Sequence, residues 1–193
     1  MARTIEEYVG NYVRETVECL QQPYLAEGLR RLVEVVLRAR REDRAIFFFG
    51  NGGSSATASH MAQDLDKLTS ATSSRRFRSH CLSDHIPVML AWANDVNFSE
   101  IFAEQIKAQG RPGDVAIGIS GSGNSPNVLR ALEEARRLGL TTVGLIGMGG
   151  GKMKDLCDVS VIVPSQNMQH IEDLHHLMLH LLASYLRDEN RGA

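Results

Sequence analysis

The sequence has few cysteines and no long apolar run, and these two absences exclude several classes of protein. Its three cysteines, Cys19, Cys81 and Cys157, lie far apart and form no CxxC pair. This pattern excludes a disulfide framework and a cysteine-rich zinc site, and it is typical of reduced, mostly buried thiols. No apolar run is long enough to span a bilayer and no signal peptide opens the chain. We therefore expect a soluble, cytoplasmic protein without a membrane partner.

An excess of charge of one sign is also missing. The net charge is −2 and the isoelectric point is about 6.4, so electrostatics do not favour nucleic acid as a partner. The short basic clusters at residues 38–41 and 75–78 are interpreted as solvated charges at a helix end and in a loop. The 193 residues contain no repeat, low-complexity tract or linker, so we expect one domain spanning residues 1–193.

The most informative stretch present is a glycine-rich turn after a short apolar strand. Phe47–Phe49 runs into Gly50-Asn51-Gly52-Gly53-Ser54-Ser55, and a helix-compatible segment follows at Ala56–Leu68. Glycines let backbone N–H groups approach a ligand, and the start of a helix adds unpaired N–H groups and partial positive charge. The turn lacks the P-loop ending and the dinucleotide-binding spacing. It predicts a seat for a phosphate or another anion.

A second turn of the same kind follows another apolar strand. Asp114–Ile119 has the pattern of a buried parallel strand and leads into Ser120-Gly121-Ser122-Gly123-Asn124-Ser125. Pro126 is suited to a first helical turn, and the helix Asn127–Leu138 is expected to end at Gly139. Small hydroxyls at the carboxyl end of a strand lie where open α/β sheets hold their ligands. Two such loops together favour a binding site over plain connections.

Strand and helix patterns alternate along most of the chain. This alternation predicts a three-layer α/β/α sandwich with a five-stranded parallel sheet over residues 43–193. Two amphipathic helices within residues 1–42 precede it as a helical hairpin, which would cap the sheet or pack against a partner subunit. Right-handed crossovers would bring both loops to the same edge of the sheet. The expected strands are Ala45–Phe49, Ser79–Leu82, Asp114–Ile119, Thr141–Ile146 and Val159–Val163, and the later helices are Ala56–Leu68, Pro87–Asn94, Ser99–Gln109, Asn127–Leu138, Lys152–Cys157 and Gln169–Leu186.

Histidines and carboxylates gather on two of the expected helices. His60 and Asp64 are four residues apart and so share a helix face. The last helix carries three of the seven histidines within six residues, together with two acids: Glu172, Asp173, His175, His176 and His180. Any one of these histidines is expected to be solvated or satisfied in the core. The whole set has the nitrogen and oxygen ligands of a divalent-metal site, with zinc the favoured ion.

Helix geometry limits which of these residues share one ion. Eight helical residues rise about 12 Å, so Glu172 and His180 do not easily bind the same metal from one regular helix. Three arrangements satisfy this limit: Glu172 precedes the first full turn, one ligand comes from a neighbouring subunit, or His176 replaces one of the two. These alternatives stay open at the level of sequence.

Several segments together resemble the sugar isomerase (SIS) domain family. The resemblance rests on Gly50–Ser54, Ala93-Asn94-Asp95, Gly113-Asp114, Ile119–Ser125 and Asp155–Pro164, and it covers nearly the whole chain. Within the family the chain is similar to the branch that isomerises heptose phosphates. The resemblance implies a cytoplasmic homotetramer that converts sedoheptulose 7-phosphate to D-glycero-D-manno-heptose 7-phosphate for lipopolysaccharide or other surface glycans. It also implies zinc bound between subunits.

The resemblance further implies roles for individual residues. The second loop would hold the phosphate, the first loop and the Asn-Asp pair would line the sugar, and the last helix would supply the catalytic histidine. The implied substrate-binding residues are Asn51, Gly52, Gly53, Ser54, Asn94, Asp95, Ser120, Gly121, Ser122, Ser125 and Glu172. The implied metal ligands are His60, Asp64, Glu172 and His180, and the catalytic candidates are His180, Asp64 and Glu172. For the Asn-Asp pair, a helix end followed by a turn is an equally good interpretation.

The chain departs from the family pattern at two carboxylates. Asp64 stands where the isomerases usually have a catalytic glutamate, and Glu172 stands where they usually have glutamine. Two imidazoles with two carboxylates would still neutralise a divalent cation. The centre of Ser120-Gly121-Ser122 also lacks the threonine often found there. Either carboxylate is therefore a candidate for the base that moves a carbon-bound proton, with His180 as the acid/base for the oxygen proton.

Other functions are compatible with the same fold. SIS relatives of this size bind the bacterial replication initiator protein without catalysis, although His60, Asp64, Glu172 and His180 argue for an enzyme here. An isomerase of a hexose or pentose phosphate, or a module that senses a sugar phosphate, would share the phosphate loops. Metal analysis and substrate profiling separate these possibilities.

Overall fold

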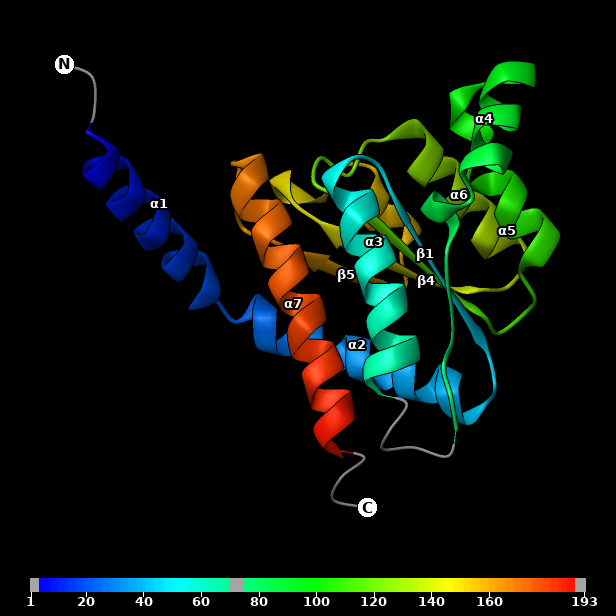
Figure 1. The fold of residues 1–193 in the computed structure, drawn as a ribbon, viewed down its shortest axis with the longest axis horizontal. Coiled ribbons are helices and arrows are strands. Elements are labelled where there is room, and N and C mark those ends of the chain that lie inside the picture. Colours follow the sequence, from blue (N-terminus) through cyan, green and yellow to red (C-terminus); the bar gives the residue numbers. More distant parts are fainter. Residues whose placement is uncertain (1–3, 70–74, 190–193) are drawn as a thin grey trace.

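The computed structural model describes residues 4–69 and 75–189, which form a parallel sheet between two layers of helices (Figure 1). The strands are β1 (Ala45–Gly50), β2 (Arg78–Cys81), β3 (Val115–Ser120), β4 (Thr141–Ile146) and β5 (Val159–Ile162), and they lie in the order β2-β1-β3-β4-β5. The helices are α1 (Ile5–Leu20), α2 (Tyr24–Arg41), α3 (Gly53–Gln63), α4 (Ile86–Asp95), α5 (Ala103–Gln109), α6 (Pro126–Arg137) and α7 (Met168–Glu189). The sequence-based prediction of a five-stranded parallel α/β sandwich is confirmed.

Each face of the sheet has its own core because side chains alternate along every strand. Ile46 and Phe48 of β1 pack among residues of α2, α3 and α7, whereas Phe47 and Phe49 pack against α5 and α6. All of β1 is buried, which explains why its sequence is continuously apolar. Burying a phenylalanine side chain contributes roughly 1.5–3 kcal/mol to the stability of the fold.

Three predicted helices differ from the structure, and the one expected over Lys152–Cys157 is only a 3₁₀ turn, Met153–Leu156. The helix expected from Ala56 begins at Gly53, and its last turn, Asp64–Leu68, is a π-helix. The helix expected over Ser99–Gln109 is divided into a 3₁₀ turn, Phe98–Glu100, and α5. A π-turn is a wider turn that is often found at functional sites, and here it begins at a candidate ligand.

The two N-terminal helices make different contacts with the sandwich. Leu32, Val35, Val36 and Ala39 of α2 are buried against the sheet. In contrast, α1 has no buried residue and extends away from the body (Figure 1). It is tethered to α7 by Tyr12, whose hydroxyl donates a 2.5 Å hydrogen bond to the Asp173 carboxylate.

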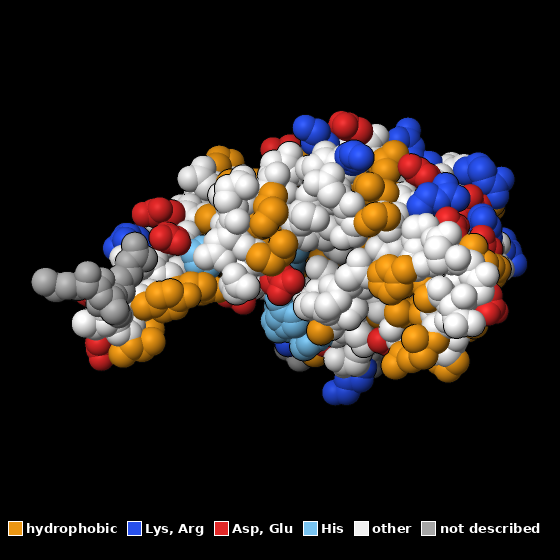
Figure 2. Space-filling view, turned by 90° about the horizontal axis from the view of Figure 1, so that it is seen from above, with side chains coloured by type: hydrophobic (Ala, Val, Ile, Leu, Met, Phe, Trp, Pro, Cys, Tyr) orange, Lys and Arg blue, Asp and Glu red, His pale blue; other side chains and the backbone are white. Residues whose placement is uncertain are grey.

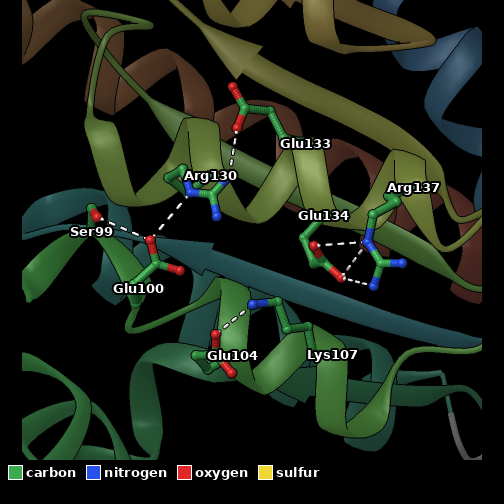
Figure 3. Close-up of polar contacts among 8 residues, drawn as sticks. All are labelled: Ser99, Glu100, Glu104, Lys107, Arg130, Glu133, Glu134 and Arg137. Carbon is green, nitrogen blue, oxygen red and sulfur yellow. Dashed lines mark hydrogen bonds and ion pairs between the residues drawn. The ribbon is translucent and has the colours of Figure 1, made fainter. Parts of the chain in front are cut away.

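Ion pairs line the outer surface of α5 and α6 (Figure 3). Arg130 of α6 lies 3.2 Å from the Glu100 carboxylate of the 3₁₀ turn and 3.0 Å from Glu133. Lys107 pairs with Glu104, and Arg137 pairs with Glu134. The cations of these pairs are exposed to solvent, which screens the attraction, so each pair is expected to contribute about 0–1 kcal/mol and to orient these segments more than it stabilises the fold.

The state of the cysteines agrees with the sequence-based expectation of reduced thiols. The three cysteines are unpaired, with Cys81 buried and the other two partly buried. Burial raises the pKa of the Cys81 thiol to about 11 and that of Cys157 to about 12, so neither is an activated thiolate. Across the described residues, every helix is too short or too polar to cross a bilayer.

Candidate active site

The two Gly/Ser-rich loops meet at the point where the strand order reverses. β2 lies on one side of β1 and β3 on the other, and Gly50 at the end of β1 is in register with Ile119 near the end of β3. The chain therefore leaves adjacent strands at the same carboxyl edge and enters α3 and α6. Open α/β sheets bind their ligands in the crevice at such a switch point.

The first loop needs glycine for two different reasons. Gly52 has a φ of 54°, in the left-handed region that favours glycine. A Cβ at Gly53 would collide with the carboxylate of Glu172 from α7. The Glu172 carboxylate therefore lies against the first turn of α3, where a negative charge is favourable because unpaired N–H groups point outward.

The second loop presents hydroxyl groups and backbone at the start of α6. The Ser120 hydroxyl lies 3.2 Å from that of Ser125, and it accepts a hydrogen bond from the Gly123 N–H. The Ser122 hydroxyl accepts from the Asn124 N–H. These loop-internal bonds shape a turn of small residues ahead of Pro126, and the α6 N-terminus adds its own partial positive charge. The arrangement is suited to a phosphate group.

A pair of amides joins the two loops. Asn51 of the first loop donates to the Asn127 Oδ1 at 2.9 Å, and Asn127 of α6 donates to the Asn51 Oδ1 at 2.8 Å. Asn127 is almost fully buried and also accepts from the Val128 N–H. Asn51 was expected to contact the sugar, but its side chain is engaged with Asn127. Asn127 was not singled out from the sequence, because nothing local distinguishes it from an ordinary first-turn asparagine.

The last helix passes over both loops. A Cβ at Gly121 would collide with the sulfur of Met168, just as one at Gly53 would collide with Glu172. From there α7 runs beside α3 and in the same direction, since Glu172 lies at Gly53 and His180 lies at His60 (Figure 1). Between these two contacts α3 carries the exposed Ala56 and the buried Thr57.

Three imidazoles and one carboxylate form a cluster farther along α3 and α7. One ligand atom from each of His60, His176 and His180 lies within 4.8 Å of the others. The Nε2 atoms of His60 and His180 are 3.1 Å apart, and the Asp64 Oδ2 is 3.5 Å from the His60 Nε2. Burial, and then the neighbouring imidazoles, lower the pKa of His176. Figure 2 shows histidine side chains gathered beside acidic ones on an open face of the molecule.

The buried histidine next to this cluster has a structural role. His175 is 1% exposed, and its Nε2 lies 3.2 Å from the carbonyl oxygen of Ile146 at the end of β4. Burial lowers its pKa to about 4, so the ring is neutral at physiological pH. With Nε2–H donating to the carbonyl, His175 fixes α7 to the carboxyl edge of the sheet.

The structure thus brings some of the expected site residues together and separates others. Both loops lie at one edge, and His60, Asp64 and His180 lie in one cluster. Glu172 lies apart from that cluster, against Gly53, whereas His176 lies within it. Asn94 and Asp95 are exposed at the end of α4, where the Asn94 amide donates to the Asp95 carboxylate at 2.8 Å.

Comparison with known proteins gives a consistent set of relatives. The profile of the SIS domain matches residues 10–147. The phosphoheptose isomerase of Paramagnetospirillum magneticum is 44% identical over 156 residues, which cover 81% of each chain. The phosphoheptose isomerase of Rhodospirillum rubrum is 35% identical over 185 residues, covering 95% of this chain and 98% of that protein.

A solved structure extends the similarity to three dimensions. The phosphoheptose isomerase of Neisseria gonorrhoeae superposes with a TM-score of 0.88 at 30% sequence identity. The match covers 96% of this chain and 100% of that one. The similarity therefore includes the N-terminal helices, both loops and the last helix.

Proposed function

The chain belongs to the SIS domain family, alongside its phosphoheptose isomerases, and on that premise we propose that it is an aldose–ketose isomerase of a phosphorylated heptose. The proposed reaction converts D-sedoheptulose 7-phosphate to D-glycero-D-manno-heptose 7-phosphate. Its place would be the cytoplasm, in heptose synthesis for lipopolysaccharide or other surface glycans. The observation that carries the proposal is the path of α7, which crosses both loops and then presents a carboxylate and imidazoles in sequence.

The phosphate is assigned to the second loop. Ser120, Ser122 and Ser125 offer hydroxyls there, and the α6 N-terminus offers N–H groups and positive potential. At the first loop, the Glu172 carboxylate already lies against the α3 N-terminus and would repel a phosphate. The first loop is therefore assigned to the uncharged part of the sugar.

The separation between Glu172 and the imidazoles fits the proton transfers of isomerisation. Gly53 and His60 are seven helical residues apart, a rise of about 10 Å. A carbon–carbon–oxygen fragment of the sugar placed beside Ala56 would lie between the Glu172 carboxylate and the imidazoles. Each of these catalytic groups would then be about 3 Å from the sugar atom on which it acts. Glu172 is then the base that removes the proton from C1 of the ketose and returns it to C2 of the enediolate. His180, with its Nε2 facing His60, uses Nδ1 to exchange the oxygen-bound proton.

The histidine cluster has the chemistry of a zinc site. His60, Asp64 and His180 are three of the four ligands that the family resemblance implies. The His60 Nε2 lies 3.1 Å from the His180 Nε2 and 3.5 Å from the Asp64 Oδ2. Nitrogen and carboxylate ligands of this type suit zinc. A bound divalent cation would supply positive charge that stabilises the enediolate oxygen.

An isomerase assay tests the proposal directly. Purified protein incubated with sedoheptulose 7-phosphate, with and without added zinc, should form the aldose. His180→Ala should reduce turnover about 10²–10⁴-fold while circular dichroism shows an intact fold. Turnover at the wild-type rate in His180→Ala would remove His180 from the mechanism, and absence of aldose under all conditions would favour a sugar-phosphate sensor.

A second variant tests where the reacting end of the sugar lies. Ala56→Leu places a larger side chain on the exposed α3 face between Glu172 and His60. Because leucine is nearly as good a helix former as alanine, stability should change by only a few tenths of a kcal/mol. We expect kcat/KM to fall by about 100-fold, roughly 3 kcal/mol of transition-state binding. Unchanged kinetics would show that the sugar does not pass over Ala56.

We also propose that the protein is a homo-oligomer, with a tetramer as the form that the resemblance to the family implies. Ile5, Val9, Val13 and Val17 repeat every four residues along α1 and are 42–68% exposed. Figure 2 shows apolar side chains following the projecting helix. A second copy of the chain is the occupant proposed for this stripe. Light scattering should give the mass of a tetramer, and Val13→Glu should reduce it.

A further inference from the structure

A third glycine-rich loop, residues 147–153, packs against the second loop. It follows β4, the strand that pairs with β3, and so leaves the sheet at the same carboxyl edge. The Gly147 N–H donates to the Gly121 carbonyl oxygen at 3.1 Å, and the Met153 N–H donates to the Gly123 carbonyl oxygen at 3.0 Å. The backbones of the two loops are therefore bonded directly to each other at both ends of the third loop.

Asn124 adds a side-chain link between the same two loops. Its Oδ1 accepts a hydrogen bond from the Lys152 N–H of the third loop at 3.1 Å. Its Nδ2 donates to the Ser122 carbonyl oxygen at 2.9 Å. The carbonyl oxygens of residues 121–123 therefore all accept hydrogen bonds, either from the third loop or from the amide that the third loop holds.

These bonds turn the donors of the second loop away from the third loop. The peptide bonds of the second loop are trans, so each N–H points to the side opposite the preceding carbonyl. The serine hydroxyls lie on the N–H side, because Ser120 Oγ accepts from the Gly123 N–H and Ser122 Oγ accepts from the Asn124 N–H. A phosphate is attracted by N–H and hydroxyl donors and repelled by carbonyl oxygens, so this division suits an anion seat.

The contact between the two loops is too close for a side chain at its centre. A Cβ at Gly151 would lie 2.6 Å from the Ser122 carbonyl oxygen and 2.7 Å from that of Gly123. From the other side, a Cβ at Gly123 would lie 2.4 Å from the Gly150 carbonyl oxygen. In contrast, Gly149 also has a positive φ, 76°, but a Cβ there would have no atom of the described residues within 4 Å.

From these contacts we infer that the third loop positions the phosphate seat, with Gly151 and Asn124 as the positioning residues. The inference rests on the proposed assignment of the phosphate to the second loop, and it identifies what holds that loop in shape. Gly151 leaves room for the carbonyl oxygens to face the third loop, and Asn124 fixes the Ser122 peptide. A displaced second loop would weaken phosphate binding, while the Glu172 carboxylate at the first loop would keep its place.

Phosphate binding by the full-length protein tests this role without depending on turnover. Inorganic phosphate is titrated into the wild type, Asn124→Ala and Gly151→Ala by isothermal titration calorimetry. Gly149→Ala is the matched glycine control, since it adds the same methyl group at a positive φ away from the second loop. Asn11→Ala is the asparagine control, because Asn11 bonds to Arg14 within α1. Circular dichroism verifies that each variant is folded, and steady-state kinetics with sedoheptulose 7-phosphate follow on the same proteins.

We expect the wild type to bind phosphate and both loop variants to bind it more weakly. The loss should be about 10–100-fold, because a misplacement of about 1 Å is enough to break a hydrogen bond to a charged group. In the kinetics, KM should rise by a similar factor while kcat stays nearly unchanged. Both controls should bind phosphate like the wild type. If Gly151→Ala is unfolded, Asn124→Ala decides the question, since it only removes side-chain atoms.

Three results would overturn the inference. Wild-type phosphate affinity in folded Asn124→Ala would show that the third loop does not position the seat. An equal loss of affinity in Gly149→Ala and Gly151→Ala would assign the effect to backbone strain. If the wild type binds no phosphate, both this inference and the assignment of the phosphate to the second loop fail. The expected order of phosphate affinities without any aldose formation would support the inference and reject the isomerase proposal.

Discussion

The two Gly/Ser-rich loops have the same sequence pattern, yet the structure makes them different sites. Each follows a buried strand, opens a helix and presents small residues at the carboxyl edge of the sheet. The first loop is already occupied at its helix N-terminus by the Glu172 carboxylate. The second loop directs its serine hydroxyls toward one another and its own backbone. The difference comes from α7, a distant segment that supplies an anion to one loop and a thioether to the other.

Because of this difference, two loops of similar sequence are suited to opposite ends of one substrate. A phosphate carries negative charge and is favoured where the seat is open, which is the second loop. A carbon that must lose a proton is favoured beside the carboxylate, which is the first loop. The direction of the substrate would thus be set by a single side chain, Glu172.

The largest loss of activity is expected when the carboxylate at the first loop, Glu172, is replaced. Glu172→Gln keeps the shape of the side chain but removes its basicity, so we expect kcat to fall about 10²–10⁴-fold with little change in KM. Steady-state kinetics with the heptose phosphate provide the measurement. If only KM changes, Glu172 orients the sugar and Asp64 becomes the carbon base.

Acidification should lower the free energy of unfolding through His175 of α7, the helix that makes the two loops different. His175 has a folded pKa of about 4, below its ordinary value, so the unfolded chain takes up a proton near pH 6.5 and the folded chain only near pH 4. Stability from this group is therefore complete above pH 6.5 and falls as the pH decreases to 4, by about 3 kcal/mol in total.

Urea denaturation between pH 4 and 7 measures this loss. His175→Gln removes the titrating group, so its free energy of unfolding should depend less on pH than that of the wild type. An identical pH dependence in both proteins would mean that other groups cause the acid effect.

A smaller effect is expected at the second loop. Ser125→Ala removes one hydroxyl from the proposed phosphate seat, and a hydrogen bond to a charged group is worth about 1.5–3 kcal/mol. We expect KM to rise about 10–100-fold and inhibition by inorganic phosphate to weaken by a similar factor. Glu172→Gln serves as the counterpart, since its inhibition by phosphate should not weaken. Weaker inhibition in Glu172→Gln alone would reverse the assignment of the two loops.

The smallest expected change concerns the amide pair that couples the loops. Asn127→Ala leaves the Asn51 amide without its partner, and we expect a loss of about 1–3 kcal/mol in the free energy of unfolding. Asn11→Ala is a suitable control because the Asn11 side chain is half-buried and accepts a hydrogen bond from Arg14 within α1, away from both loops. Equal stability of Asn127→Ala and the wild type would show that the loops are held independently.

Much of the fold follows from patterns that operate over short distances. The apolar runs, the glycines after Phe49 and Ile119, and the helical spacing of His60 and Asp64 depend on neighbours within a few residues, and the structure contains each corresponding element. The helix boundary at Gly53 and the π-turn at Asp64 were missed because they depend on packing against α7.

The sequence by itself determined the order of strands and helices, the two loops and the residue types available for chemistry, because strand alternation, helical period and glycine conformations are local properties. Only the tertiary structure decided which of those residues meet. The reciprocal bond between Asn51 and Asn127 spans 76 positions and the contact between His60 and His180 spans 120. Such contacts depend on how α7 lies over the sheet, which is set by the packing of α7 into the core on its face of the sheet and by the hydrogen bond of His175, not by any single segment.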